Sequence, residues 1–392
     1  MASVEDERLQ FVEECKSGEW SMAEVCRRFE ISRITGYKWL SRFETEGLSG
    51  LKDRSHAPHS NPRQVVEEVE DAIVEARGQH AHWGPVKLRS WLEKRAPEVK
   101  WPAPSTIGEI LRRHGLAVAH THKKRGKATP NQEPLKHAQG PNLVWCADFK
   151  GWFRCLDGSR CDPLTITDEY SRYLLRCQAV KRPDLFYTKP LFDATFREYG
   201  LPDAIRIDNG PPFASVGIGG LSALSIWWIK LGIRPERIKP GKPAENGRHE
   251  RMHRTLKMEA TQPAQNNLRA QQKTFDRFRQ EYNHERPHQA LQGQTPAELY
   301  LPSARVYNSR LREVIYPSDF EVRTVSNGGQ IRWNHSRVFV GHALMHEPIG
   351  LELCGDGKWR VWFSFYELGV FDEKKLLIQP KPIQAATNSA AQ

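Results

Sequence analysis

The stretch AIRIDNG, residues 204–210, decides the fold of this chain, because a short apolar run followed by an acid and Asn-Gly is typical of a strand that ends at a sharp turn. Asp208 is the acid at this strand end. Farther along, a run without glycine or proline around Glu250 predicts a helix. Arg254 and Lys257 follow Glu250 at positions i+4 and i+7, so one helix face carries an acid and then two bases. Such a face suits a metal ion beside a nucleic-acid backbone.

A third acid lies upstream, in the segment LVWCADFKGWF at residues 143–153, which is apolar and rich in strand-forming residues. Strand alternation places Asp148 on the same face as Val144, Cys146 and Lys150. A carboxylate in the middle of so apolar a strand is costly to bury unless it is paired or binds a cation. The position of Asp148 therefore favours a functional role.

The three acids Asp148, Asp208 and Glu250 lie on a strand, at a strand end and on a helix, with Asn-Gly after the second and the pattern NGxxE around the third. This arrangement resembles the catalytic core of DDE transposases and retroviral-type integrases. In particular, the chain resembles the insertion-sequence transposases whose DNA-binding and integrase parts share one polypeptide. The resemblance covers nearly the whole chain, including residues 282–300, which are similar to the segment that closes the core in that family.

Two other acids compete for these roles. Asp168 also follows a predicted strand, but the first acid of the family matches Asp148, so we expect Asp168 to cap a turn or to pair with Arg172. Glu245 lies before the predicted helix, whereas the glutamate of the family stands three residues after Asn-Gly, which selects Glu250.

Bulk composition limits the class of protein. The 392 residues are enough for roughly two to four domains of ordinary size. The net charge of +11 favours polyanionic partners. The seven cysteines are scattered and form no CxxC pair, which indicates reduced, mostly buried thiols in a cytosolic protein, without a disulfide framework or zinc site. The N-terminus lacks the apolar core of a signal peptide and Lys230 interrupts the longest apolar patch, so we expect neither secretion nor a membrane span.

Residues 1–52 are predicted to form a helix-turn-helix DNA-binding domain. Ser21 and Glu24 form a capping box for its second helix, and Ser32 offers an N-cap for the third. In the third helix, apolar residues should face inward, and they are Ile34, Tyr37, Leu40 and Phe43. The outward residues suited to base edges and phosphates are Arg33, Thr35, Lys38, Ser41 and Arg42. An ordinary three-helix bundle with a solvated basic face is the alternative.

Residues 61–118 resemble the second, winged-type helix-turn-helix domain of the same transposases. Apolar residues recur at helical spacing, Pro104 marks a helix start and Gly115 a stop. Arg112 and Arg113 stand in the last helical turn, where they either reach a DNA phosphate or complement the helix dipole.

Residues 119–141 contain almost no apolar side chains and are predicted to be an extended basic linker. Lys123, Lys124 and Arg125 can follow a DNA backbone with salt-sensitive affinity, or they simply solvate a tether. The histidine pairs near this region have no cysteine pair at zinc spacing, so a zinc module is not expected.

From residue 142 the pattern changes to strands, and then to alternating strands and helices, which predicts an RNase H-like α/β catalytic core over residues 142–302. It includes a helix from Asp184 to Tyr199 that should bury three aromatic residues, namely Phe186, Phe192 and Phe196. The expected fold class is therefore multidomain, with all-α helix-turn-helix units before this core.

Residues 315–380 alternate apolar and polar side chains and predict a small β-barrel. It resembles the C-terminal barrels of integrases, which contact DNA or a sister subunit, and a plain structural cap is equally consistent. Residues 381–392 are predicted to be a disordered tail.

The resemblance implies a two-metal enzyme. In it, Asp148, Asp208 and Glu250 are the catalytic and metal-binding residues for two Mg²⁺ ions, with Mn²⁺ as a substitute; Asp148 bridges both ions, Asp208 holds one and Glu250 the other. Arg254 and Lys257 lie beside a DNA phosphate, unless they form a plain exposed helix face.

The implied reaction is cleavage at the terminal inverted repeats of a mobile element, followed by attack of the freed 3′-hydroxyl on target DNA. The implied partners are double-stranded DNA and further copies of the chain on paired ends, in the cytoplasm of a bacterium at the nucleoid. One competing class is a domesticated DNA-binding protein in which the core is only a scaffold, and the loss of an acid would mark it. The other is an RNase H-like nuclease, which needs neither two helix-turn-helix units nor a C-terminal β domain.

Overall fold

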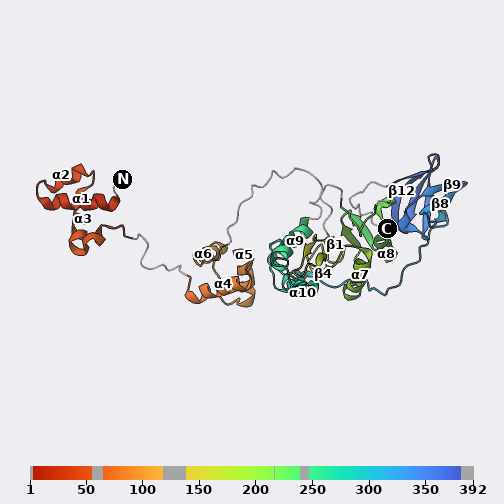
Figure 1. Cartoon of the computed structure of the whole chain (residues 1–392), viewed down its shortest axis with the longest axis horizontal. Helices are drawn as coiled ribbons and strands as arrows, with labels where there is room; N and C mark the ends of the chain where they lie inside the picture. The colour runs from red at the N-terminus through yellow and green to blue at the C-terminus, as the bar shows by residue number, and fades with distance from the viewer. Residues whose placement is uncertain (1–2, 55–64, 118–137, 216, 239–246, 381–392) are drawn as a thin grey trace. The chain divides into compact units, whose positions relative to one another are not determined.

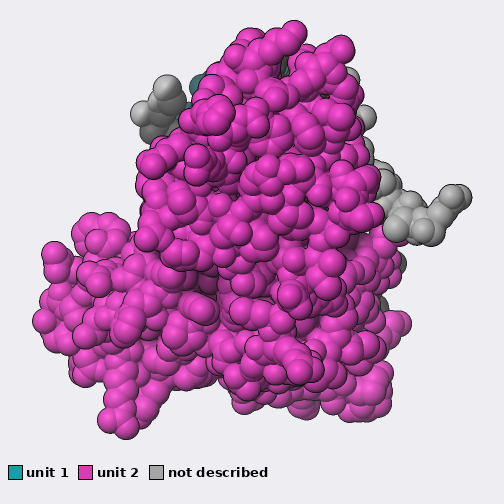
Figure 2. Space-filling model, turned by 90° about the vertical axis from the view of Figure 1, so that its right-hand side faces the viewer, with its two compact units in different colours: residues 1–65 teal, residues 66–392 magenta. Residues whose placement is uncertain are grey.

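The computed structural model of the chain describes residues 3–54, 65–117, 138–215, 217–238 and 247–380. The chain divides into two compact units, residues 1–65 and residues 66–392, which Figure 2 colours separately. Among the described helices, none has the length and apolar character needed to cross a membrane.

The first unit contains three helices, α1 (Val4–Ser17), α2 (Met22–Arg28) and α3 (Arg33–Glu46), followed by the 3₁₀ turn η1 (Gly47–Leu51) (Figure 1). The predicted capping box of Ser21 and Glu24 begins α2. The Ser32 side chain accepts a hydrogen bond from the backbone of α3, as predicted. These helices enclose a small core of apolar residues, namely Phe11, Val12, Val25, Cys26, Trp39 and Leu51.

The inward face of α3 differs in part from the prediction. Ile34 is 84% exposed and Tyr37 is 58% exposed, whereas Gly36 and Trp39 are buried. A Cβ atom on Gly36 would lie 2.7 Å from the Cys26 sulfur, so α3 makes its closest approach to α2 at this glycine. The prediction of Ile34 and Tyr37 as inward residues was wrong because glycine carries no side chain and adds no hydrophobic signal to the pattern.

Within the second unit, three helices come first: α4 (Glu67–Gln79), α5 (Pro85–Arg95) and α6 (Pro104–Arg113). Pro104 begins α6 as predicted. Over residues 65–117 the structure describes helices and turns but no strand, so the winged form of this domain stays a prediction.

A mixed sheet follows, built from β1 (Val144–Phe149), β2 (Phe153–Arg154), β3 (Arg160–Asp168), β4 (Leu174–Val180), β5 (Ala204–Ile207) and β6 (Arg234–Arg237). Its order is β2-β3-β1-β5-β6, and β4 also pairs with β3. The first strands are antiparallel, whereas β1, β5 and β6 run parallel. Parallel strands need crossover connections, and helices provide them.

Helices cover both faces of this sheet (Figure 1). One face packs against α7 (Leu185–Tyr199) and α8 (Ala223–Lys230), and the other packs against α9 (Gly247–Ala260) and α10 (Leu268–His284). The short helix α11 (Pro296–Leu299) follows, and further 3₁₀ turns are η2 (Ile218–Gly220), η4 (Gln289–Leu291) and η5 (His342–Leu344).

Helix α7 begins after Asp184, whose side chain accepts a hydrogen bond from its first turn, and ends at Gly200, as predicted. Phe192 and Phe196 are buried as expected, but Phe186 is 76% exposed. Phe186 precedes Phe192 by six residues, which turns it by roughly 120° away from the buried stripe of the helix. The prediction for Phe186 was therefore wrong.

The C-terminal region forms open sheets, and the prediction of a β-barrel was wrong. One sheet has the order β13-β12-β11-β10-β7, so β13 (Leu377–Pro380) and β7 (Glu321–Thr324) are its two edges. Its inner strands are β10 (Pro348–Gly355), β11 (Lys358–Phe363) and β12 (Tyr366–Asp372), and β8 (Gln330–Trp333) with β9 (Ser336–Phe339) forms a separate hairpin.

This hairpin packs against the larger sheet and lies beside its edge strands β7 and β13, and among the described residues it shares no hydrogen-bonded ladder with either. The Trp333 ring of β8 lies 5.0 Å from the Trp359 ring and 5.1 Å from the Phe371 ring, measured between centroids. The same apolar core includes Ile226 and Ile229 of α8. The C-terminal sheets are therefore joined to the mixed sheet through α8.

Candidate active site

Strand pairing positions Asp148 at the centre of the site. On one side β1 runs parallel to β5, with Val144 opposite Ala204. If this register is continued four residues along both strands, Asp148 stands opposite Asp208. On the other side Asp148 lies directly opposite Thr165 of β3. Cross-strand neighbours share a face of the sheet, and this is the face that α9 covers.

The turn after β5 holds the Asp208 carboxylate. The backbone N–H of Gly210 donates to Asp208 Oδ1 at 3.2 Å. A Cβ atom on residue 210 would stand 3.1 Å from the same carboxylate, which favours a glycine here. Asn209 bonds to the end of β6 through the Ile238 carbonyl and the Arg237 guanidinium, at 2.8 and 2.9 Å. These bonds tie the turn to the sheet.

Helix α9 carries Glu250 in its first turn. Glu250, Arg254 and Lys257 are all exposed, while Met252 and Leu256 of the same helix are buried in the core. The acid and two bases thus lie on the solvent side of the helix, as their spacing predicted. Glu245, the competing acid, lies outside the described residues.

Burial and like charge act together on the carboxylates. Burial, followed by the negative charges of Asp208 and Glu250, raises the pKa of Asp148 to about 7. Burial also raises the pKa of Asp208 above its ordinary value. The pKa of Lys150 is lowered, by burial and then by the charge of Lys257. The charges of Asp208 and Glu250 act on Asp148, and a bound cation would offset this repulsion, so these carboxylate oxygens fit a hard, oxygen-binding divalent ion.

Two histidines that sequence reasoning missed lie beside Asp148. Among the described residues, Asp148, His249 and His253 are the His, Cys, Asp or Glu side chains whose potential ligand atoms all lie within 4.8 Å of one another. Both histidines are buried, and this lowers the pKa of His249 to about 3 and that of His253 to about 2. Their signal was present in the sequence as H-E-x-x-H at residues 249–253, two histidines one helical turn apart.

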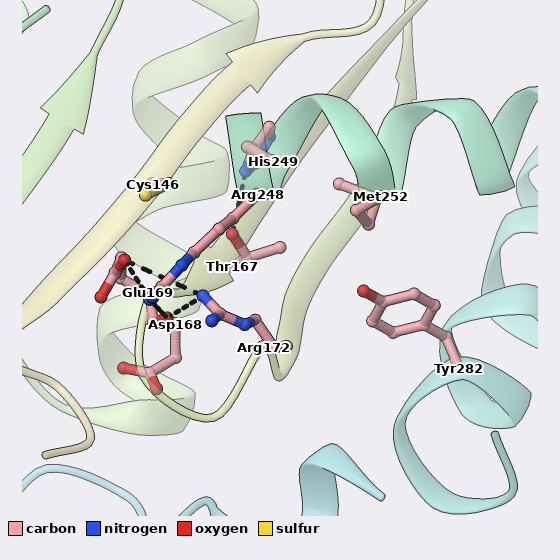
Figure 3. Close-up of a pocket in the computed structure, with 9 residues that line it drawn as sticks. All are labelled: Cys146, Thr167, Asp168, Glu169, Arg172, Arg248, His249, Met252 and Tyr282. Carbon is pink, nitrogen blue, oxygen red and sulfur yellow. Dashed lines mark hydrogen bonds and ion pairs between the residues drawn. The ribbon is translucent and has the colours of Figure 1, made fainter. Parts of the chain in front are cut away.

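An ion-pair cluster lies next to His249 and lines the pocket shown in Figure 3. Arg248 donates to the Glu169 carboxylate at 2.5 Å, and Arg172 donates to the Glu169 carbonyl at 2.5 Å. Asp168 accepts from the backbone and hydroxyl of Ser171, at 2.8 and 2.7 Å. The expected turn-capping role of Asp168 is therefore observed, while Arg172 bonds to Glu169.

Arg248 connects the first turn of α9 to a glutamate side chain that is only 2% exposed. We expect Arg248→Gln to lower the free energy of unfolding by about 1–3 kcal/mol, because it removes one charged hydrogen-bond donor from a buried carboxylate. Arg251→Gln, on an exposed position of the same helix, is the matched control. Denaturant unfolding of both variants measures the effect, and equal stabilities would contradict it.

The candidate DNA-binding residues differ in their exposure and in their side-chain contacts. Arg33 and Lys38 are exposed on α3. Thr35 is half-buried and its hydroxyl bonds to Ser32 at 2.9 Å, and the Arg42 guanidinium lies 5.3 Å from the Trp39 ring centroid.

Two further candidates, Arg112 and Arg113, are exposed but pair with Glu109 and Glu70. The linker residues Lys123, Lys124 and Arg125 lie outside the described residues. The predicted contacts of all these side chains with DNA remain predictions.

Comparison with known proteins places the site within recognised domains. A family model described as a helix-turn-helix domain matches residues 7–59, and one described as a homeodomain-like domain matches residues 35–111. Two models described as an integrase core domain match residues 138–243 and 231–296. The first contains Asp148 and Asp208, and the second contains Glu250.

Similar proteins come from insertion elements. An uncharacterized 31.7 kDa protein of insertion element IS407 from Burkholderia multivorans is 26% identical, over 61% of this chain and 83% of its own length. An uncharacterized 39.2 kDa protein of IS476 from Xanthomonas euvesicatoria is 26% identical, over 71% of this chain and 78% of its own. The HTLV-2 integrase catalytic core in complex with magnesium is 17% identical over 41% of this chain and 97% of its own, with a TM-score of 0.33.

Proposed function

The chain belongs to the insertion-sequence transposases that combine N-terminal helix-turn-helix domains with an integrase-type core, and from this premise we propose that it cleaves and joins DNA at the ends of its element. The proposed substrates are terminal inverted repeats and target duplex DNA. The proposed catalytic residues are Asp148, Asp208 and Glu250. The observation that carries the proposal is geometric: Asp148 lies on β1, Asp208 follows the adjacent parallel strand β5, and Glu250 lies on the helix that covers this face of the sheet.

The carboxylate set fits divalent magnesium, which prefers oxygen ligands, and Mn²⁺ is the expected substitute. Two such ions, when bound, would activate the attacking water or 3′-hydroxyl and stabilise the leaving oxygen. Asp148 is proposed to contact both ions, because it lies between Asp208 and the helix that carries Glu250. The same residues serve cleavage and joining, since only the nucleophile changes between the two steps.

Basic side chains around the acids are proposed to hold the DNA backbone. Arg254 and Lys257 are exposed on α9, and burial, followed by the charge of Lys257, lowers the pKa of Lys150. Two cations held close together are favoured when a phosphate lies between them. These side chains are thus suited to the phosphates that flank the scissile bond.

The helix-turn-helix domains are proposed to recognise the element ends. The exposed face of α3 carries Arg33 and Lys38 together with the apolar Ile34 and Tyr37. This mixture suits a major groove, where cations contact phosphates or guanine and apolar groups contact thymine methyls. Pairing of two ends requires at least two copies of the chain, so we propose a homo-oligomer on DNA, in the cytoplasm at the bacterial nucleoid.

A direct assay tests the proposal. The purified chain is incubated with Mg²⁺ and a duplex that carries the end of the element, and nicked and joined products are separated on a denaturing gel. Both products are expected. Binding without products would indicate a DNA-binding scaffold, and cleavage confined to RNA–DNA hybrids would indicate an RNase H-like nuclease. The presence of all three acids argues against the scaffold.

A further inference from the structure

His249 and His253 have no part in the proposed reaction, although their side chains face Asp148. They lie four residues apart on α9, so both rings project from the same side of the helix. The pattern H-E-x-x-H that contains them has the spacing with which helices bind zinc. The hydrogen bonds around the two rings decide which nitrogen atoms are available to a metal ion.

The Thr165 hydroxyl determines the tautomers. Its oxygen lies 3.1 Å from the Asp148 carbonyl, 2.7 Å from His249 Nε2 and 2.7 Å from His253 Nε2. A hydroxyl has one hydrogen and two lone pairs. A carbonyl can only accept, so the Thr165 hydroxyl donates its one hydrogen bond to the Asp148 carbonyl. Both histidine Nε2 atoms must then donate to the hydroxyl oxygen for all three hydrogen bonds to form. A neutral imidazole has one N–H, so both Nδ1 atoms carry lone pairs.

The two Nδ1 atoms then differ in their partners. His249 Nδ1 lies 2.9 Å from the Thr167 hydroxyl, which donates to it, so both nitrogen atoms of His249 are hydrogen-bonded to threonine hydroxyls. His253 Nδ1 instead lies 3.9 Å from Asp148 Oδ2, too far for a direct hydrogen bond. A metal ion at about 2.0–2.2 Å from each ligand spans this separation with a wide angle between them.

A hydrogen bond to Thr165 also fixes the orientation of the His253 ring. Metal-binding histidines generally donate their second N–H to a fixed acceptor, which orients the ring. His253 Nε2 donates to Thr165, whose hydroxyl is bonded to the backbone of β1. Asp148 and His253 are therefore connected through Thr165 as well as facing each other.

From this geometry we propose that Asp148 and His253 Nδ1 bind a divalent ion of the zinc class, and that His249 is a positioning residue that is not a ligand. Imidazole nitrogen suits zinc, cobalt and nickel ions, whereas magnesium prefers oxygen. The site shares Asp148 with the proposed magnesium site, so zinc and magnesium compete. The proposal does not depend on catalysis, because it concerns metal binding by the free chain.

Calorimetric titration of the full chain with Zn²⁺ tests this site. The chain has 15 histidines, so zinc also binds elsewhere, and the proposed site is identified by the difference between the wild type and each variant. We expect His253→Gln and Asp148→Asn to weaken one binding step by about tenfold or more. His284→Gln, on an exposed position of α10, is the matched control and should titrate like the wild type. His253→Gln should leave Mg²⁺ binding unchanged.

A zinc titration of His253→Gln that matches the wild type would overturn the proposal. Nitrogen-15 NMR of the histidine side chains in the unmodified chain provides a second readout that no folding defect can obscure. Both buried rings should be Nε2–H tautomers, and zinc should shift the Nδ1 resonance of one of them. If zinc shifts both rings or neither, the assignment of His253 alone as the histidine ligand is wrong.

Discussion

Asp208→Asn and Glu250→Gln are each expected to lower the rate of DNA cleavage by about 10³-fold or more, because each would remove one charged oxygen ligand of a proposed ion, whose binding would stabilise charge in the transition state by several kcal/mol. The measurement is a single-turnover time course with Mg²⁺ and end-containing duplex. Both substitutions replace a carboxylate with an amide of similar shape, so the sheet and α9 should remain intact.

The controls come from α10 and from the residue that follows it, next to the same core. Asp276→Asn and Glu285→Gln remove exposed carboxylates and should cleave at the wild-type rate. The two site variants should still bind end DNA with unchanged affinity, since the helix-turn-helix domains are the proposed site of recognition. Undiminished products from Asp208→Asn and Glu250→Gln would show that the three acids are not the catalytic set.

Asp148→Asn is expected to stabilise the metal-free protein at pH 8 although it abolishes cleavage. In the folded protein, burial and the charges of Asp208 and Glu250 raise the pKa of Asp148 to about 7, from an ordinary value of 3.8. A carboxyl group with a raised folded-state pKa contributes most to stability below pH 4, and this contribution is lost as the pH rises to 7. The asparagine does not ionise and loses nothing over this range.

The gain from Asp148→Asn should therefore grow between pH 5 and pH 8, by on the order of 2 kcal/mol. Denaturant unfolding at the two pH values without divalent ions measures it, with Asp276→Asn as the control. Added Mg²⁺ should stabilise the wild type and not the variant, because bound cations offset the repulsion. A gain that does not change with pH would mean that Asp148 is not held against the other acids.

The chain shows what a sequence pattern can predict about a site. The apolar run before Asp208, the apolar strand around Asp148 and the helix around Glu250 each have a local signature, and the structure contains all three elements. The neighbouring positions of the two strands were not predicted, because no local pattern reports parallel pairing. His249 and His253 were missed although the pattern H-E-x-x-H is present, because the β3 threonines that orient them stand 82 to 88 positions away in the chain.

The failures share a physical cause. The buried face of α3 is set by Gly36, where the missing side chain permits close approach, and such an absence leaves no trace in hydrophobic spacing. Alternation predicted the C-terminal strands, but whether β7 meets β13 depends on long-range pairing. Local periodicity reports which face of an element is apolar and does not report which element covers it.

Helix α8 belongs to two apolar cores, with Trp228 in the core of the mixed sheet and Ile226 and Ile229 in the core of the C-terminal sheets. Its last residue, Lys230, also pairs with Glu347. An exchange of C-terminal gene segments between related elements would therefore have to preserve the fit to a helix encoded far upstream. Substitutions in α8 and in the C-terminal sheets that contact it should therefore occur together, which limits how freely such elements can acquire new C-terminal parts.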